Sequence, residues 1–128
     1  MYKGLCDYIM KEICTQRVIV HDHVKYILGE AIAKRYGLTV KYEYYIYLPE
    51  ESKNGYIDLT FFKGNKKVLA IELDSSYKYK SLKKLSTVDF PFKLWVCFAR
   101  KYKPDKLEMF ARLGVPICTR FVRLNGVD

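Results

Sequence analysis

The chain has 128 residues, of which 50% are hydrophobic and 16% aromatic, which suits one domain with a single core and excludes a disordered polypeptide. Its 23 Lys and Arg residues against 14 Asp and Glu give a formal net charge of +9, which favours a polyanionic partner, most simply nucleic acid, although basic proteins also bind anionic membranes. No apolar run is long enough to cross a membrane and no signal peptide is recognisable, so we expect a soluble, intracellular, cytoplasmic protein with no membrane partner.

Two helices are predicted before the first strand. Residues 2–13 carry apolar side chains at helical spacing, and we expect about 1–20 to form an N-terminal helical extension of a single domain that spans 1–128. A second helix is expected from Asp22, a favourable N-cap residue, to Tyr36.

The histidines and cysteines lack a convincing metal-binding pattern. His21 and His23 could bind a metal from one face of a strand, but without a third ligand the motif is more typical of a helix start. No Cys-x-x-Cys pair exists, so Cys97 and Cys118, which lie in apolar segments, are interpreted as buried free thiols. A disulfide is possible only if the source is a hyperthermophile, where intracellular disulfides occur.

Three strands are expected next. Residues 39–48 are rich in β-branched and aromatic side chains, which favour a strand. Two apolar runs follow, at 56–62 and 68–74, and the break Gly64-Asn65 between them suits a hairpin turn.

The hydrophobic pattern decides how this hairpin pairs. A two-residue turn would set Asp58 across from Ile71 and mix the faces, whereas a loop longer by one residue, or an equivalent bulge, sets Asp58 across from Glu72. The second register puts the large apolar residues of the hairpin on one face: Ile57, Leu59, Phe61, Leu69, Ile71 and Leu73.

This register also gathers three carboxylates. Neighbouring strands lie about 4.8 Å apart, so Asp58, Glu72 and Asp74 would share one small patch. Carboxylates that close raise one another's pKa unless a cation lies between them. Mg²⁺ or Mn²⁺ suits such an all-oxygen site.

The remaining elements alternate between helix and strand. Residues 75–85 are read as a loop that enters a helix, 92–99 as a central strand covered on both faces, 105–113 as a helix opened by Pro104, and 115–124 as a last strand. The predicted fold class is α/β, a mixed sheet flanked by helices in the order α-α-β-β-β-α-β-α-β.

The acids also resemble a known motif. Asp58, followed after thirteen residues by Glu72-Leu73-Asp74 at the end of an apolar strand, resembles the core of the PD-(D/E)xK nucleases, the superfamily of restriction enzymes and archaeal Holliday junction resolvases. The chain departs from that motif at the lysine, where Asp74 stands, a variant found in some branches of the superfamily.

The resemblance implies a restriction-endonuclease-like fold and Mg²⁺-dependent or Mn²⁺-dependent hydrolysis of DNA, with no small-molecule cofactor. In that scheme Asp58, Glu72 and the Leu73 carbonyl bind metal, and Asp74 binds metal or acts as the base for water. Glu30, from the helix before the sheet, completes the metal site, as a Glu on that helix often does in the family. The resemblance further implies a homodimer, located in the host cytoplasm if the source is viral.

The lysines that follow the acids are expected to contact phosphate. Lys78 or Lys80 is also expected to supply the positive charge that the motif lysine would have provided. The predicted DNA-binding set is Lys34, Lys78, Lys80, Lys83 and Lys84. The sequence leaves two other functions open: a catalytically inactive nucleic-acid-binding protein with this fold, and a protein-interaction domain whose acids bind a basic partner.

Overall fold

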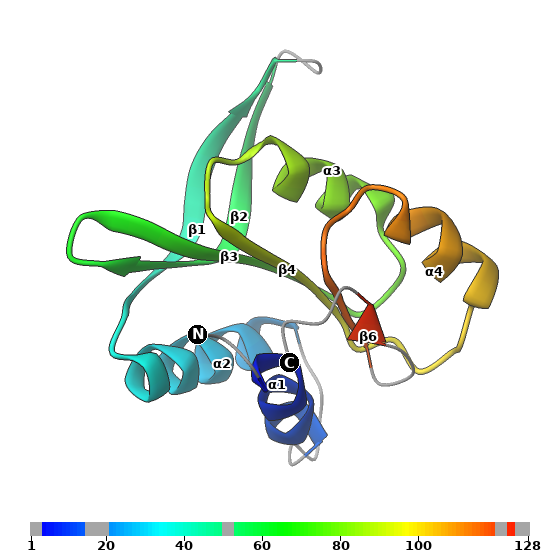
Figure 1. Ribbon diagram of the computed structural model, residues 1–128, viewed down its shortest axis with the longest axis horizontal. Coiled ribbons are helices and arrows are strands. Elements are labelled where there is room, and N and C mark those ends of the chain that lie inside the picture. The colour runs from blue at the N-terminus through cyan, green and yellow to red at the C-terminus, as the bar shows by residue number, and fades with distance from the viewer. Residues whose placement is uncertain (1–3, 15–20, 50–52, 120–122, 125–128) are drawn as a thin grey trace.

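The computed structural model describes residues 4–14, 21–49, 53–119 and 123–124 (Figure 1). Its strands form one mixed sheet in the order β1-β2-β3-β4-β5-β6. The first three strands are antiparallel, β4 and β5 run parallel to β3, and β6 is antiparallel to β5. The strand bounds are β1 Thr39–Leu48, β2 Lys53–Lys63, β3 Lys66–Asp74, β4 Phe92–Cys97, β5 Ile117–Thr119 and β6 Arg123–Leu124.

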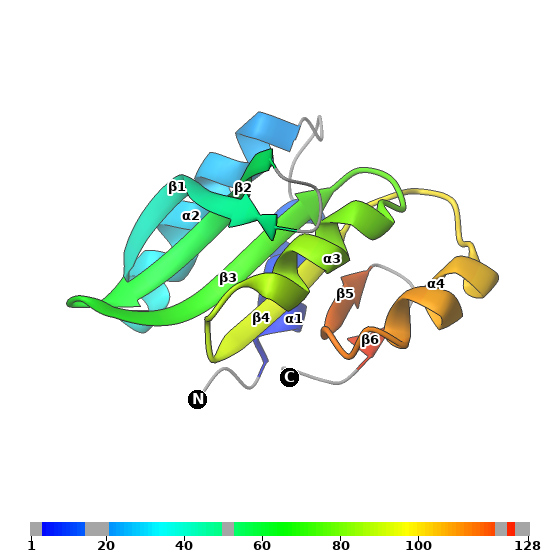
Figure 2. The ribbon, with the colours of Figure 1, turned by 90° about the horizontal axis from the view of Figure 1, so that it is seen from above.

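Helices cover both faces of the sheet, which confirms the predicted α/β class and element order (Figures 1 and 2). On one face lie α1 (Leu5–Cys14) and α2 (His21–Tyr36), whose apolar residues share a core with Leu59, Phe61 and Ile71. On the other face lie α3 (Tyr79–Thr87) and α4 (Pro104–Ala111), packed around Trp95 in a second core, so the single core predicted from the chain length is divided in two by the sheet. No described helix is long and apolar enough to span a membrane.

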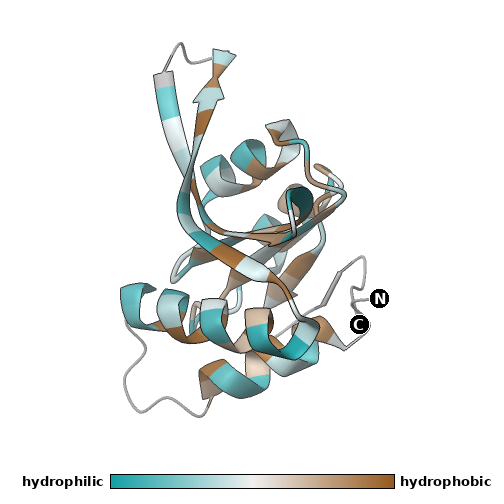
Figure 3. Cartoon of the chain, turned by 90° about the vertical axis from the view of Figure 1, so that its left-hand side faces the viewer, coloured by the Kyte–Doolittle hydropathy of each residue, from teal (hydrophilic) through white to brown (hydrophobic). Residues whose placement is uncertain are grey.

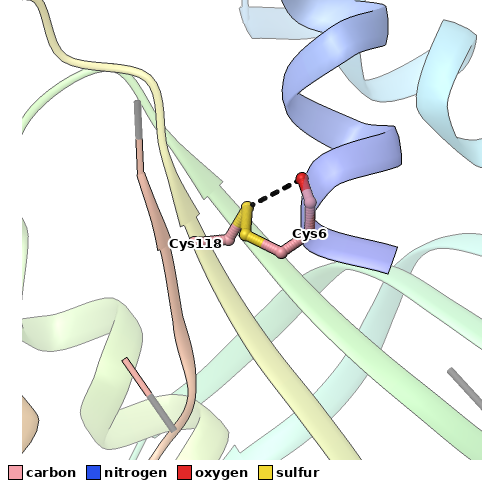
Figure 4. The surroundings of a disulfide bond; sticks show 2 residues. All are labelled: Cys6 and Cys118. Atoms are coloured by element: carbon pink, nitrogen blue, oxygen red, sulfur yellow. Dashed lines mark hydrogen bonds between the residues drawn. A yellow bond between two sulfur atoms is a disulfide. The ribbon is translucent and has the colours of Figure 1, made fainter. Parts of the chain in front are cut away.

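The helix predicted near the N-terminus is part of the first core. Leu5, Ile9 and Ile13 are at most 1% exposed there. Cys6 of α1 is joined to Cys118 of β5 by a disulfide, with the two Cα atoms 5.6 Å apart, and the Cys118 Sγ lies 3.5 Å from the Cys6 carbonyl oxygen (Figure 4). The interpretation of Cys118 as a free thiol was therefore wrong, whereas Cys97 is buried as a reduced thiol, as predicted.

The β2–β3 hairpin has the register that the hydrophobic pattern requires. Leu59 pairs with Ile71 and Phe61 with Leu69. The turn itself has two residues, because Lys63 pairs with Lys66, and a bulge after Phe61 absorbs the difference. The bulge that the sequence left as an alternative is thus the one present, and it keeps the apolar side chains on the intended face.

A kink in β1 redirects the far half of the β1–β2 hairpin. Glu43 has a φ of 51°, which is uncommon for a residue with a side chain, and it is missing from the ladder between the pairs Tyr42–Leu59 and Tyr44–Ile57. Leu59 packs in the first core but Ile57 packs in the second, so the predicted placement of Ile57 beside Leu59 was wrong. Beyond the kink the hairpin projects past α3 as an arm (Figures 1 and 3).

The C-terminal strand predicted over 115–124 is two strands. β5 lies beside β4, and β6 folds back against β5 through the pairs Ile117–Leu124 and Cys118–Arg123. The residues between them, 120–122, lie outside the described part of the chain. The sheet therefore ends in an antiparallel pair that the single run of apolar residues did not reveal.

Candidate functional site

The candidate site lies where β2 and β3 separate. Their ladder ends at Leu59–Ile71, and two carboxylates continue the hydrogen bonding beyond it. The Asp58 amide donates to Glu72 Oε1 over 2.9 Å, and the Leu73 amide donates to Asp58 Oδ2 over 2.9 Å. Each acid thus satisfies a backbone amide of the opposite strand, and the predicted juxtaposition of Asp58 with Glu72 is confirmed.

Glu72 is a buried carboxylate held by a lysine from α3. Its side chain is 3% exposed, and Lys84 Nζ lies 3.1 Å from Glu72 Oε2 while also donating to the Tyr56 carbonyl oxygen over 2.9 Å. Burial, reinforced by the nearby Asp58 charge, raises the pKa of Glu72 to about 7, even though Lys84 and the Asp58 amide act in the opposite direction. Lys84 therefore does not fully offset the cost of burying the ionised Glu72 carboxylate next to Asp58.

Asp74 lies two residues along β3 from Glu72, on the same side of the strand. Trp95 Nε1 donates to Asp74 Oδ2 over 2.7 Å, the Ser81 side chain hydrogen-bonds the same carboxylate, and Lys78 Nζ lies 3.9 Å from Oδ1. Burial raises the pKa of Asp74 although these three partners oppose the shift, and the Asp58 charge adds to it. Asp74 is thus oriented by fixed donors and has an increased affinity for a proton.

A histidine from the start of α2 reaches the same site. His21 Nε2 lies 2.8 Å from the Leu73 carbonyl oxygen and 3.5 Å from Asp58 Oδ2. The pKa of His21 is raised because the charges and hydrogen bonds of Asp58, Asp22 and the Leu73 carbonyl outweigh burial, which acts to lower it. The helix begins at His21, so Asp22 lies in its first turn and is not the N-cap residue predicted, and the contact with Leu73, 52 residues away, was not predicted.

The lysine that enters the site is not the one expected. Lys84 was predicted as a phosphate contact and instead pairs with Glu72, whereas Lys78 stands beside Asp74 with its side chain 60% exposed. Lys80 and Lys83 are exposed on α3. The sequence does contain a signal for Lys84, because it lies three residues after Ser81, on the same face of an amphipathic helix.

Two predicted residues lie elsewhere on α2. The Tyr42 hydroxyl donates to Glu30 Oε1 over 3.0 Å, and burial together with Glu30 raises the pKa of Tyr42 to about 12. Glu30 follows His21 by nine residues, about 13 Å along a helix axis, and Lys34 lies one turn further. The structure therefore does not bring Glu30 to the three acids, or Lys34 to the lysines of α3.

The donors present are those that Mg²⁺ prefers. Two carboxylates, Asp58 and Glu72, and the Leu73 carbonyl offer hard oxygen ligands. In the conformation described, Lys84 and His21 take positions at Glu72 Oε2 and the Leu73 oxygen that a metal would use. Within the described ranges no group of three His, Cys, Asp or Glu side chains is arranged to hold a metal.

A basic hollow adjoins the acids at the carboxyl ends of β3 and β4. It has a volume of about 370 Å³ and follows Asp74 directly in the chain. Its lining includes Ser75, Ser76, Arg100, Lys101 and Lys103. Hydroxyl, guanidinium and ammonium groups in such a hollow suit a phosphate group.

In comparisons with protein-family models, curated proteins and solved structures, none matched the chain.

Proposed function

We propose that the protein is a metal-dependent endonuclease that hydrolyses phosphodiester bonds in DNA. The observation that carries this proposal is the pair of carboxylates, Asp58 and Glu72, held together by backbone hydrogen bonds where β2 and β3 separate, with Glu72 buried and its pKa raised to about 7 by burial and by the Asp58 charge. Carboxylates with strongly raised pKa values beside a like charge are typical of sites that bind a cation or move protons.

The residues divide into metal-binding and proton-transferring roles. Asp58, Glu72 and the Leu73 carbonyl would hold Mg²⁺ or Mn²⁺, which supplies a more acidic bound water and stabilises charge that develops on the phosphate. Asp74, oriented by Trp95 and Ser81, is placed to accept the proton of the attacking water. Such a role requires the ionised form of Asp74, so activity should rise with pH through its raised pKa.

Lysines supply the positive charge that the motif lacks at position 74. Lys84 reaches Glu72 from α3, and Lys78 reaches Asp74 from the residue just before that helix. Lys80, Lys83 and the basic hollow extend the positive surface along which a DNA backbone could run. A homodimer that cuts two strands symmetrically is part of the proposal and is checked by analytical ultracentrifugation.

Cleavage assays on matched variants test the nuclease. We expect wild-type protein to cut a panel of branched and linear DNAs with Mg²⁺ or Mn²⁺ and to be inactive in EDTA. Asp58→Asn and Glu72→Gln should each lower the rate by a factor of at least about 100. Glu108→Gln, which changes an exposed glutamate of α4 in the same chemical way, should cut at the wild-type rate. Equal rates for Glu72→Gln and Glu108→Gln would contradict the proposal.

A second function is favoured by the hydrogen bonding of the same acids. Asp58 and Glu72 join two separating strands through their carboxylates, and Lys84 is an ion-pair partner of Glu72. In this second function the protein binds nucleic acid without cutting it, and the contacts of the acids serve only to stabilise the fold. In that case the wild type would retain DNA but cut none of the panel with either metal, and Asp58→Asn would lower stability without changing DNA affinity.

A further inference from the structure

The projecting arm carries three tyrosines on one side. Tyr45 and Tyr47 alternate along β1, and Tyr56 pairs with Tyr45 from β2, so all three lie on one face of the hairpin. They are 56%, 56% and 55% exposed. The rings of Tyr45 and Tyr56 have centroids 6.1 Å apart, and the Tyr45 hydroxyl donates to Asn54 Oδ1 over 2.6 Å.

The opposite side of the arm is the one that packs against the protein. Tyr44, Ile46 and Ile57 contribute to the second core, and the Tyr44 ring contacts Phe62 and Phe90. Within the described part of the arm, the large apolar side chains left exposed are the three tyrosines. Tyrosine rings with polar tips are found at protein interfaces and also stack readily on nucleobases, and the net charge of +9 favours the polyanionic partner.

The arm is connected directly to the acid site. Tyr56 precedes Asp58 by two residues, about 7 Å along a strand. The Tyr56 carbonyl accepts a hydrogen bond from Lys84, the lysine that pairs with Glu72. A strand of DNA that lay on the tyrosine face would therefore enter the site where β2 and β3 separate.

We propose that Tyr45, Tyr47 and Tyr56 stack on unpaired bases, so that the site acts on DNA with a single-stranded segment. Tyr45 and Tyr47 are alternate residues of β1 and so lie about 7 Å apart, close to twice the ~3.4 Å rise between stacked bases, which leaves room for a base between these two rings, while Tyr56 lies edge-on beside Tyr45. Base faces are accessible only where the duplex is open. The net charge of +9 supplies the attraction for the backbone. This inference deepens the proposed function, on which it rests, by naming the class of substrate.

Binding measured without metal separates this inference from the cleavage reaction. In EDTA, wild-type protein is titrated with a single-stranded oligonucleotide that contains 2-aminopurine and with a blunt duplex of equal length. We expect the double variant Tyr45→Leu/Tyr56→Leu to bind the single strand at least tenfold more weakly and to lose the change in 2-aminopurine fluorescence, while duplex affinity stays within twofold. Tyr45→Phe/Tyr56→Phe keeps both rings and should stay within threefold of wild type for both DNAs.

Two controls complete the design. Tyr26→Leu removes a ring of α2 that is 52% exposed away from the arm and should leave single-strand affinity unchanged. Urea denaturation checks that each variant is folded. The inference is overturned if the leucine variant binds single strands as wild type does, if it loses duplex affinity equally, or if its main effect is to dissociate a wild-type dimer. Stacking without cleavage would contradict the nuclease but leave the single-strand preference standing.

Discussion

Replacing Glu72 with glutamine should stabilise the protein at alkaline pH. Glutamine mimics the neutral carboxyl, and the pKa of Glu72 rises from 4.5 in a flexible chain to about 7 in the folded protein. The folded state therefore binds a proton more tightly than the unfolded state, and stability falls as pH increases from 4.5 to about 7. A pKa shift of this size means that the ionised Glu72 lowers the free energy of unfolding by about 3 kcal/mol at pH 8. Because the glutamine amide would also face Lys84, that figure is an upper limit for the gain.

The measurement uses urea denaturation followed by tryptophan fluorescence. Trp95 is the single tryptophan and is 0% exposed, so its emission reports the core around Asp74. We expect the free energy of unfolding of Glu72→Gln to exceed that of wild type at pH 8, with the difference disappearing or changing sign near pH 4. Glu108→Gln should show no such pH dependence. A loss of stability at pH 8 as large as that at pH 4 would refute the charge argument.

Three further predictions concern the lysine, the disulfide and the charge. Lys84→Met should lower the free energy of unfolding by about 1–3 kcal/mol at pH 8 and by less at pH 5, where Glu72 is protonated, whereas Lys106→Met, on the exposed side of α4, should have little effect in the same denaturation series. Cys6→Ser/Cys118→Ser should cost about 2–4 kcal/mol in urea denaturation, because the bond closes a loop of 112 residues, and an unchanged midpoint would contradict this. Duplex affinity, measured by fluorescence anisotropy, should fall at least tenfold between about 50 and 200 mM salt; a flat salt dependence would argue against phosphate contacts.

The sequence predicted the register of the hairpin because the faces of a strand alternate. A one-residue slip would have exposed Leu59, Phe61 and Ile71, so the hydrophobic pattern was sufficient to place Asp58 near Glu72. The kink at Glu43 could not be predicted, since glutamate gives no sign of a positive φ. That kink moved Ile57 to the other core and created the arm.

Contacts between distant segments were the least accessible to sequence reasoning. His21 lies 52 residues from Leu73 and Cys6 lies 112 residues from Cys118, and neither contact has a local pattern. Glu30 was assigned to the site by resemblance, whereas the helix geometry places it beside Tyr42. Lys84 was recognised as basic and close to the acids, but only the orientation of α3 showed that it faces Glu72.

We propose that Asp58, Glu72 and Asp74 together bind a divalent cation. Electron paramagnetic resonance of Mn²⁺ tests this directly, since bound Mn²⁺ loses its sharp six-line spectrum. At pH 8, titration of wild-type protein should show one bound ion per chain that excess Mg²⁺ displaces, and Glu72→Gln should abolish it. Absence of a bound ion in the wild type, or equal binding by Glu72→Gln, would contradict the account.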